Sequence, residues 1–165
     1  MKRWICAAAL FALAGCSAVP SVPTHLQTQG VAMKASGGAF SGAYAGYYVG
    51  GSCNTRFGFT GSGSASFIHA STESGSMGPS LGMSCLFNGS VTIKNNFRPS
   101  NSITIVLGQS GLPCSSRTRI LGIPFTVASG TGRFINATGS GKVRFTCGSG
   151  ISRTYTDQWS GTITF

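Results

Sequence analysis

Acidic residues are nearly absent from this chain. Only 2 of its 165 residues are Asp or Glu, against 12 Lys and Arg, and charged residues of both signs make up 8% of it, where an average soluble domain holds about 25%. Because 41% of the residues are hydrophobic and the 25 glycines follow no collagen-like period, neither a disordered basic tail nor a collagen fits. We expect one folded domain, in which Glu73 and Asp157 are the carboxylates.

The chain also lacks an apolar run long enough to cross a bilayer as a helix. Residues 4–15 form a short apolar stretch after a Met-Lys-Arg start, which is shorter than the roughly 20 residues of a membrane helix and typical of a signal peptide. The stretch ends in Leu13-Ala14-Gly15-Cys16, which resembles the lipobox of bacterial lipoproteins. That resemblance implies cleavage before Cys16 and attachment of fatty acyl chains such as palmitate. Ser17, where Asp would indicate the inner membrane, implies the outer membrane.

The lipobox sets the expected domain boundaries. Residues 1–15 would be the removed signal peptide, residues 16–38 an acylated N-terminus with a Pro- and Gly-containing tether, and residues 39–165 the folded domain. Loss of Lys2 and Arg3 would change the formal net charge from +10 to +8. These charges are spread along the chain of an exported protein, so we expect a location in the cell envelope and no nucleic-acid partner.

Cysteine spacing predicts disulfides and no metal site. Four cysteines fall in the folded part, at spacings of 32, 29 and 33 residues: Cys53, Cys85, Cys114 and Cys147. Zinc sites use closer pairs, whereas an even number in an exported chain predicts two disulfides. Cys85 with Cys114 is favoured because its midpoint falls in the turn residues 98–101, which would leave Cys53 with Cys147. A hairpin turn at 88–89 would remove that argument, and Cys114 with Cys147 is centred on 130–131, so the pairing stays open.

Helical periodicity is lacking after residue 38, while alternation with period two recurs. Residues 142–147 and 159–165 alternate without an error, and about eight such runs are separated by Gly, Ser and Asn. The pattern predicts an all-β fold, namely a small antiparallel, calycin-like barrel of about eight strands. Most runs are shorter than the 9–11 residues of a membrane-spanning strand, and Gly61-Ser62-Gly63 is predicted to be a turn.

One motif carries a family resemblance. The order Gly130-Thr131-Gly132-Arg133-Phe134, then Ala137-Thr138-Gly139, resembles a hallmark of allene oxide cyclase-like and dirigent-like barrels. The resemblance implies a folding corner in which Phe134 closes one end of the barrel. It carries over no activity, because the family's enzymes rely on polar groups inside the barrel and neither carboxylate lies within a motif that matches.

Candidate catalytic residues are few. His69 and Glu73 face the same way in an extended strand, yet they stand about 13 Å apart at 3.3 Å per residue, which is too far for a dyad unless the chain turns between them. We expect His69 to be a barrel-lining or a half-buried structural histidine, and Asp157 to pair with an arginine or to cap the turn before Trp159. No metal or cofactor is expected.

Basic residues offer a different kind of site. Arg117 and Arg119 share one strand face, and Lys142 and Arg144 share another. If neighbouring strands bring the pairs together, they form a basic stripe for anionic lipid, lipopolysaccharide or an acidic polymer.

The leading hypothesis is a membrane-anchored lipoprotein whose barrel is a binding or structural module of the envelope. Its expected partners are the membrane, through the N-terminal lipid, and anionic envelope components or a small hydrophobic ligand. The alternative is a cyclase-, isomerase- or hydrolase-like enzyme acting on a hydrophobic ligand in the barrel. A third possibility is an integral outer-membrane barrel, which also ends in an aromatic residue such as Phe165. The scarcity of acids favours binding, and convergent polar groups in the interior would favour the enzyme.

Overall fold

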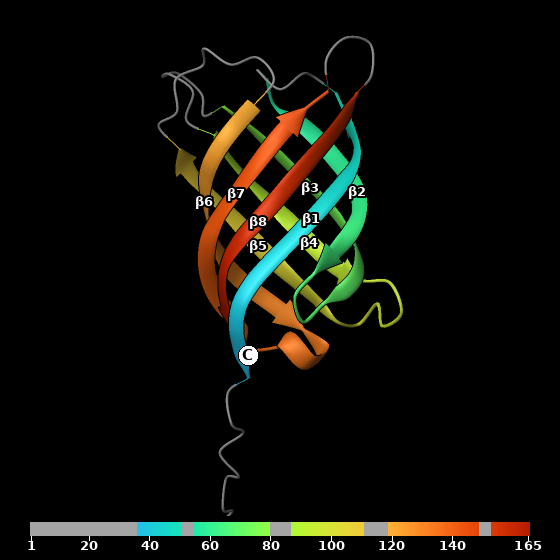
Figure 1. Cartoon of the computed structure of the whole chain (residues 1–165), viewed down its shortest axis with the longest axis vertical. Helices are drawn as coiled ribbons and strands as arrows, with labels where there is room; N and C mark the ends of the chain where they lie inside the picture. The colour runs from blue at the N-terminus through green and yellow to red at the C-terminus, as the bar shows by residue number, and fades with distance from the viewer. Residues whose placement is uncertain (1–35, 51–54, 80–86, 111–118, 149–152) are drawn as a thin grey trace, which may run out of the picture. The chain divides into compact units, whose positions relative to one another are not determined.

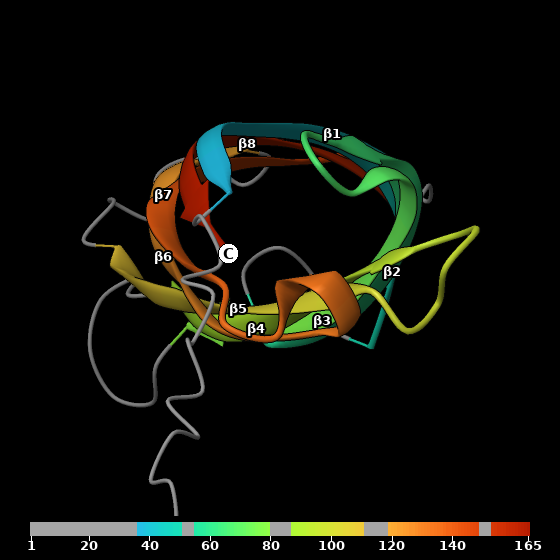
Figure 2. The same ribbon diagram turned by 90° about the horizontal axis from the view of Figure 1, so that it is seen from below.

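The chain closes into a barrel of antiparallel strands. The computed structural model describes residues 36–50, 55–79, 87–110, 119–148 and 153–165. Each strand pairs with the next one and β8 pairs with β1 (Figure 1; Figure 2, seen from below). The all-β, eight-stranded antiparallel barrel predicted from the sequence is therefore confirmed. Its elements are β1 (Gly37–Val49), β2 (Phe57–Ala65), β3 (His69–Pro79), β4 (Phe87–Asn95), β5 (Ser102–Ser110), β6 (Arg119–Thr131), the 3-10 helix η1 (Gly132–Phe134), β7 (Thr138–Cys147) and β8 (Thr154–Thr164).

Period-two alternation sorts the side chains into an interior and an exterior. On β8, Tyr155, Asp157 and Trp159 are buried, and the residues between them are exposed. Eight strands leave an interior just wide enough to be filled by side chains, and the buried set is mainly aromatic and aliphatic. Outward positions are rich in hydroxyls, as with Thr60 and Ser62 on β2. The barrel thus has a mainly apolar filling and a Ser- and Thr-rich outer wall.

The strands are longer than the alternating runs in the sequence. They contain 9 to 13 residues, because strand pairing continues through glycine and serine positions that show no apolar alternation. The turn predicted at Gly61-Ser62-Gly63 is wrong, since these residues lie in the middle of β2. The described helical segment, η1, has three residues, and among the described residues no helix has the length and apolar character needed to cross a membrane.

The lower end of the barrel in Figure 1 is where β1 begins and β8 ends. Ser36 and Phe165 exchange two backbone hydrogen bonds there, both of 2.7 Å. Gly132 has a φ of +59°, a left-handed conformation that favours glycine, and this turn brings Phe134 into the interior, where its ring packs on Phe165 at a centroid distance of 4.8 Å. The corner motif, which also includes Gly130, Thr131 and Gly139, therefore contains a fully buried aromatic residue, Phe134, at this end of the barrel.

The upper end holds the end of β1 and the start of β8, and Cys147 is buried there at the end of β7. Cys53, Cys85 and Cys114 lie outside the described residues, as do Cys16 and Arg117. The disulfide pairing therefore stays a prediction.

Inward-facing glycines make room for large rings on neighbouring strands. Gly46 of β1 pairs with Gly61 of β2, and Tyr155 of β8 is the other partner of Gly46. A methyl group added to Gly61 would collide with the Tyr155 hydroxyl and would lie 2.8 Å from the Ala45 carbonyl oxygen. The Tyr155 side chain therefore extends across the backbone of two glycines, Gly46 and Gly61.

Gly61→Ala is expected to lower the free energy of unfolding by about 1–3 kcal/mol, because the added methyl group needs space that Tyr155 and the β1 backbone occupy. Thermal or urea unfolding followed by circular dichroism measures the loss. Gly58→Ala, on the same strand, is the matched control, because its methyl group would meet Val49 at an ordinary 3.4 Å. Equal losses in the two variants would contradict the packing of Tyr155 over Gly61.

Candidate functional site

Both acidic residues of the chain lie inside the barrel. Glu73 on β3 is 0% exposed and Asp157 on β8 is 2% exposed. The expected pairing of Asp157 with an arginine or a turn is wrong, because Asp157 shares a strand face with Trp159 and Ile163, which face the core. Every Lys, Arg and His side chain whose burial the structure describes is exposed: Arg56, His69, Lys94, Arg98, Arg133, Lys142, Arg144 and Arg153.

Strand pairing places Tyr155 of β8 and Glu73 of β3 in one row of paired residues, with β1 and β2 between them. The register runs from Tyr155 to Gly46, from Gly46 to Gly61 and from Gly61 to Glu73. Since the two middle residues have no side chain, the phenol can cross them, and its hydroxyl donates a 2.6 Å hydrogen bond to Glu73 Oε1. The ring is held by stacking on Phe145, at a centroid distance of 4.6 Å and an interplanar angle of 12°.

A second row, one step further toward the lower end, repeats this arrangement. It runs from Asp157 to Tyr44, then to Gly63 and Ser71. Tyr44 lies over Gly63, and its hydroxyl is 2.7 Å from Ser71 Oγ. Because Ser71 Oγ donates to the His69 carbonyl oxygen at 2.9 Å, Tyr44 is the donor to Ser71. The two rows tie β8 and β1 to β3 through side chains.

Several polar atoms at the centre have no hydrogen-bond partner among the described residues. They are Glu73 Oε2, both carboxyl oxygens of Asp157, and Trp159 Nε1. The two carboxyl groups nevertheless lie close enough to affect each other's pKa, and the Trp159 indole lies close enough to lower the pKa of both. We call these residues the carboxyl cluster: Tyr44, Ser71, Glu73, Tyr155, Asp157 and Trp159.

Burial controls the protonation of the carboxyl cluster. Removal from water raises the pKa of Asp157 to about 10, and the neighbouring Glu73 carboxyl adds to the rise. Burial also raises the pKa of Glu73, although hydrogen bonding from Tyr155 opposes the rise. The pKa values of Tyr44 and Tyr155 are raised as well, chiefly by burial. Asp157 is therefore protonated at neutral pH and can donate a hydrogen bond, which an ionised carboxylate cannot do.

The structure separates His69 from Glu73. His69 begins β3 at the lower end with a φ of +63° and an exposed side chain, whereas Glu73 is fully buried. The expectation that His69 lines the barrel or is half-buried is therefore wrong, because the turn before it places its side chain at the exposed rim. Among the described residues, no three His, Cys, Asp or Glu side chains come together as metal ligands.

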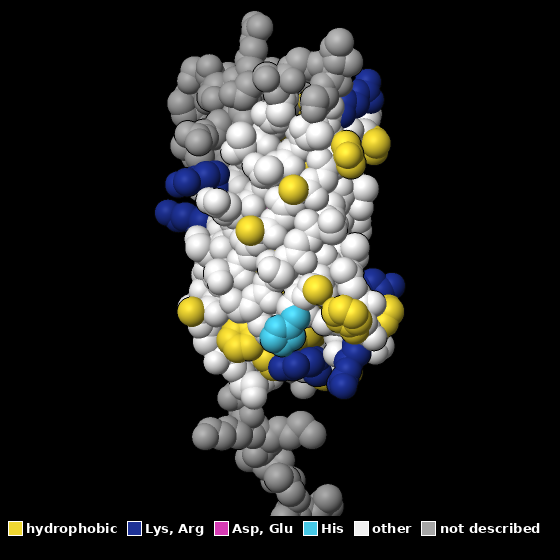
Figure 3. Space-filling view, turned by 45° about the vertical axis from the view of Figure 1, so that its right-hand side comes forward, with side chains coloured by type: hydrophobic (Ala, Val, Ile, Leu, Met, Phe, Trp, Pro, Cys, Tyr) yellow, Lys and Arg dark blue, Asp and Glu magenta, His cyan; other side chains and the backbone are white. Residues whose placement is uncertain are grey.

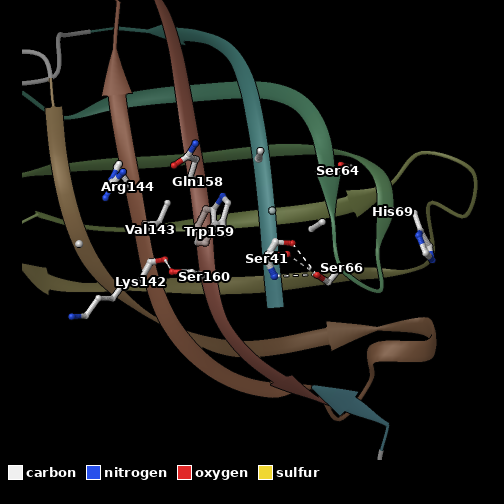
Figure 4. A pocket seen from close by; sticks show the side chains of 14 residues that line it. Ser41, Ser64, Ser66, His69, Lys142, Val143, Arg144, Gln158, Trp159 and Ser160 are labelled. Atoms are coloured by element: carbon white, nitrogen blue, oxygen red, sulfur yellow. Dashed lines mark hydrogen bonds between the residues drawn. The ribbon is translucent and has the colours of Figure 1, made fainter. Parts of the chain in front are cut away.

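A shallow groove of about 790 Å³ runs over the outer wall formed by β7, β8, β1 and β2. Figure 4 shows Lys142 and Arg144 on one side of it and His69 on the other. Its floor carries hydroxyls, and Ser41 and Ser66 are joined by a 3.0 Å bond between their Oγ atoms. The groove offers cations and hydroxyl groups to a polar, anionic partner, and neither carboxyl of the cluster lines it.

The structure describes only some residues of the predicted basic stripe. Lys142 and Arg144 are exposed on β7, and the backbone of Arg119 pairs with that of Thr146 on the same strand. The starting residue of β6 therefore lies next to the cationic part of β7. Arg117 falls outside the described residues.

Comparisons with protein-family models, with curated proteins and with solved structures found no match for this chain.

Part of the carboxyl cluster could have been found from the sequence. Asp157 lies two residues before Trp159 in an alternating run, so the same alternation places it on the inner face. Glu73 gave no such signal, because its neighbours on the same face of β3 are Ser71 and Gly75, so no apolar alternation marks the inner face there. Its burial follows from closure of the barrel, which sets the register with β2.

The free energy of unfolding should decrease as the pH rises. Between an unfolded pKa of about 4 and the folded value of about 10, the native state keeps the Asp157 proton that the unfolded chain has lost. Stability therefore falls as pH rises through this window, by up to about 1.4 kcal/mol per pH unit. The groups that face Asp157 are Glu73, Tyr44, Tyr155 and Trp159.

Asp157→Asn should flatten the decrease in stability with rising pH, because an amide keeps the shape of the protonated acid and cannot ionise. Urea unfolding at pH 5, 7 and 9 measures the slope for the wild type and the variant. We expect the free energy of unfolding of the variant, relative to that of the wild type, to increase as the pH rises. Ionisation of Glu73 should leave the variant with a smaller dependence of stability on pH. A wild type that is most stable at pH 9 would contradict the assignment.

Proposed function

We propose that this chain is a lipid-anchored lipoprotein of the bacterial cell envelope, with the outer membrane as its location, whose barrel is a binding module for anionic envelope components. The observation that supports binding is the distribution of charge. Both carboxyl groups are buried, so the charged side chains described on the exterior are all positive. A surface of one sign attracts partners of the other sign over a distance of about 8 Å at physiological salt.

The lipid anchor rests on the lipobox Leu13-Ala14-Gly15-Cys16 and on the tether that follows it. Two or more acyl chains hold a protein stably at a membrane, whereas a single chain holds it marginally. The described chain enters the barrel at Ser36, at the lower end. An anchored barrel would be joined to the membrane from that end.

The outer wall argues against the integral outer-membrane barrel. Strands of 9 to 13 residues are long enough to span a bilayer, so the short runs of the sequence no longer weigh against it. Such a barrel needs an apolar outward face, whereas β2 turns Thr60, Ser62 and Ser64 outward. The hydroxyl-rich wall supports a barrel that faces water.

The carboxyl cluster is the observation that favours the enzyme alternative. A protonated Asp157 beside Glu73 and Tyr155 could serve as a general acid and base for a ligand in the barrel. Against this, Tyr155 is packed between Phe145 and Phe59, and neither carboxyl group lines the groove over β7, β8, β1 and β2 or the hollow at the lower end. Packing therefore favours a structural role for the cluster and a binding role for the surface.

The two predicted disulfides would fit a protein of the cell envelope, where cysteines are oxidised. Residue order places Cys53 between β1 and β2, Cys85 between β3 and β4, and Cys114 between β5 and β6. The strand ends that flank all three positions lie at the end that carries Cys147. The preferred pairing of Cys85 with Cys114, and of Cys53 with Cys147, would join neighbouring connections around the ring.

Cys16→Ala should abolish incorporation of radioactive palmitate, because the thiol that accepts the diacylglyceryl group is removed. Cells expressing the wild type or the variant are labelled, and the immunoprecipitated protein is counted. Cys6→Ala is the matched control, since Cys6 lies within the signal peptide and should leave labelling unchanged. Equal label in the wild type and in Cys16→Ala would overturn the anchor.

A further inference from the structure

The lower end of the barrel combines large exposed apolar side chains with cations. Phe97, in the turn after β4, is 82% exposed, and Ile135, directly after η1, is 71% exposed. Lys94, Arg98 and Arg133 lie in or beside the same turns and are exposed as well. Figure 3 shows basic, hydrophobic and histidine side chains gathered at this end, and no acidic side chain is visible on the face drawn.

Asparagine side chains hold these turns in place. Asn95 Oδ1 accepts hydrogen bonds from the backbone N–H groups of Phe97 at 2.9 Å and Arg98 at 2.7 Å. Asn95 Nδ2 donates to the carbonyl oxygen of Ile68, in the turn between β2 and β3. These hydrogen bonds fix the turn that carries Phe97 to the turn between β2 and β3. Phe97 is therefore exposed on an ordered turn.

The turn that carries Ile135 is fixed in the same way. Asn101 Oδ1 accepts a 3.2 Å hydrogen bond from the backbone of Arg133, and Thr131 Oγ1 donates at 2.6 Å to the carbonyl oxygen of Ser100. The Arg133 guanidinium lies over the Phe134 ring at 5.1 Å. Three turns therefore form one preorganised surface around a hollow whose lining includes Phe97, Arg98 and Arg133.

We propose that this lower end docks on an anionic lipid leaflet, with Phe97 and Ile135 inserted among the headgroups and Lys94, Arg98 and Arg133 on the lipid phosphates. Apolar side chains at the boundary between headgroups and acyl chains bind through buried area, and each nearby cation adds attraction to anionic lipid. The proposal deepens the proposed function by naming its partner and the surface that meets it.

Chain connectivity favours a membrane as the occupant. Ser36 bonds to Phe165 at this end, and Cys16 lies 20 positions earlier in the sequence. An acyl group at Cys16 would keep the lower end within reach of the leaflet that holds it. An acidic polymer would use the cations, but it would give the exposed Phe97 and Ile135 nothing apolar to contact.

The test uses residues 16–165 with Cys16→Ser, which carries no acyl chain and keeps every strand of the barrel. Co-sedimentation is measured with vesicles of phosphatidylcholine alone and of phosphatidylcholine with phosphatidylglycerol, at low and physiological salt. The chain should bind the anionic vesicles more tightly, and added salt should weaken this binding.

Two double variants test the lower end. Lys94→Gln with Arg98→Gln should weaken binding to anionic vesicles by roughly 25-fold, or about fivefold per cation. Phe97→Ser with Ile135→Ser should weaken it by about tenfold. Both changes leave Arg133 on its aromatic rings, and thermal unfolding checks that each variant is folded.

Matched controls remove the same groups elsewhere. Arg56→Gln with Arg153→Gln removes two exposed cations that directly precede β2 and β8 at the upper end, and Tyr47→Ser with Val49→Ser removes two side chains from β1 that are 66% and 62% exposed. Both controls should bind within about twofold of the wild type.

Each other outcome overturns the proposal in a distinct way. Equal losses in lower-end and control variants would leave the proposed anionic binding standing and remove the lower end as its site. Loss with the cation variant alone would show that Phe97 and Ile135 do not enter the leaflet, and it would overturn the inserted docking in favour of purely electrostatic contact. No preference for anionic vesicles would overturn both the docking and the proposed binding module, whereas palmitate labelling at Cys16 would still establish the anchor.

Discussion

The hydrogen bond from Tyr155 to Glu73 depends on a part of the barrel wall that has no side chains. Two glycines lie between these residues in the strand register, and only their missing side chains let the phenol reach the carboxyl group. The second row, from Asp157 through Tyr44 to Ser71, follows the same rule. No Lys, Arg or His side chain whose burial the structure describes enters the interior. No buried cation there favours ionisation of the carboxyl groups, and burial raises the pKa of both.

Burial of both acids has a consequence at the surface. It removes the negative charge that would otherwise balance the exposed lysines and arginines, so the described exterior is cationic in its charged side chains. The buried cluster and the proposed binding of anionic partners are thus two results of one distribution of charge. At the lower end this charge adjoins Phe97 and Ile135, held by turns that Asn95 and Asn101 stabilise.

The sequence predicts the fold correctly, but it does not predict which polar residues lie inside the barrel. Alternation from Trp159 to Phe165 predicted an inner face correctly, and the turn at 98–101 separates β4 from β5 as expected. Neither β3 nor the middle of β2 carries apolar alternation, because small and polar residues stand where the tyrosines cross. Local pattern could therefore not show that Glu73 faces inward. His69 was placed wrongly for a related reason, since backbone strain at a turn leaves no mark in composition.

The central claim is that both acidic side chains are buried and that Asp157 is protonated at neutral pH. The chain has one Asp and one Glu, so a protein labelled with carboxyl-¹³C aspartate gives a single aspartate carboxyl signal, which can be followed by NMR during a pH titration without further assignment. The account predicts that the Asp157 signal stays at its protonated position from pH 5 to 8 and moves near a pKa of about 10. A midpoint near the ordinary value of about 4 would contradict it.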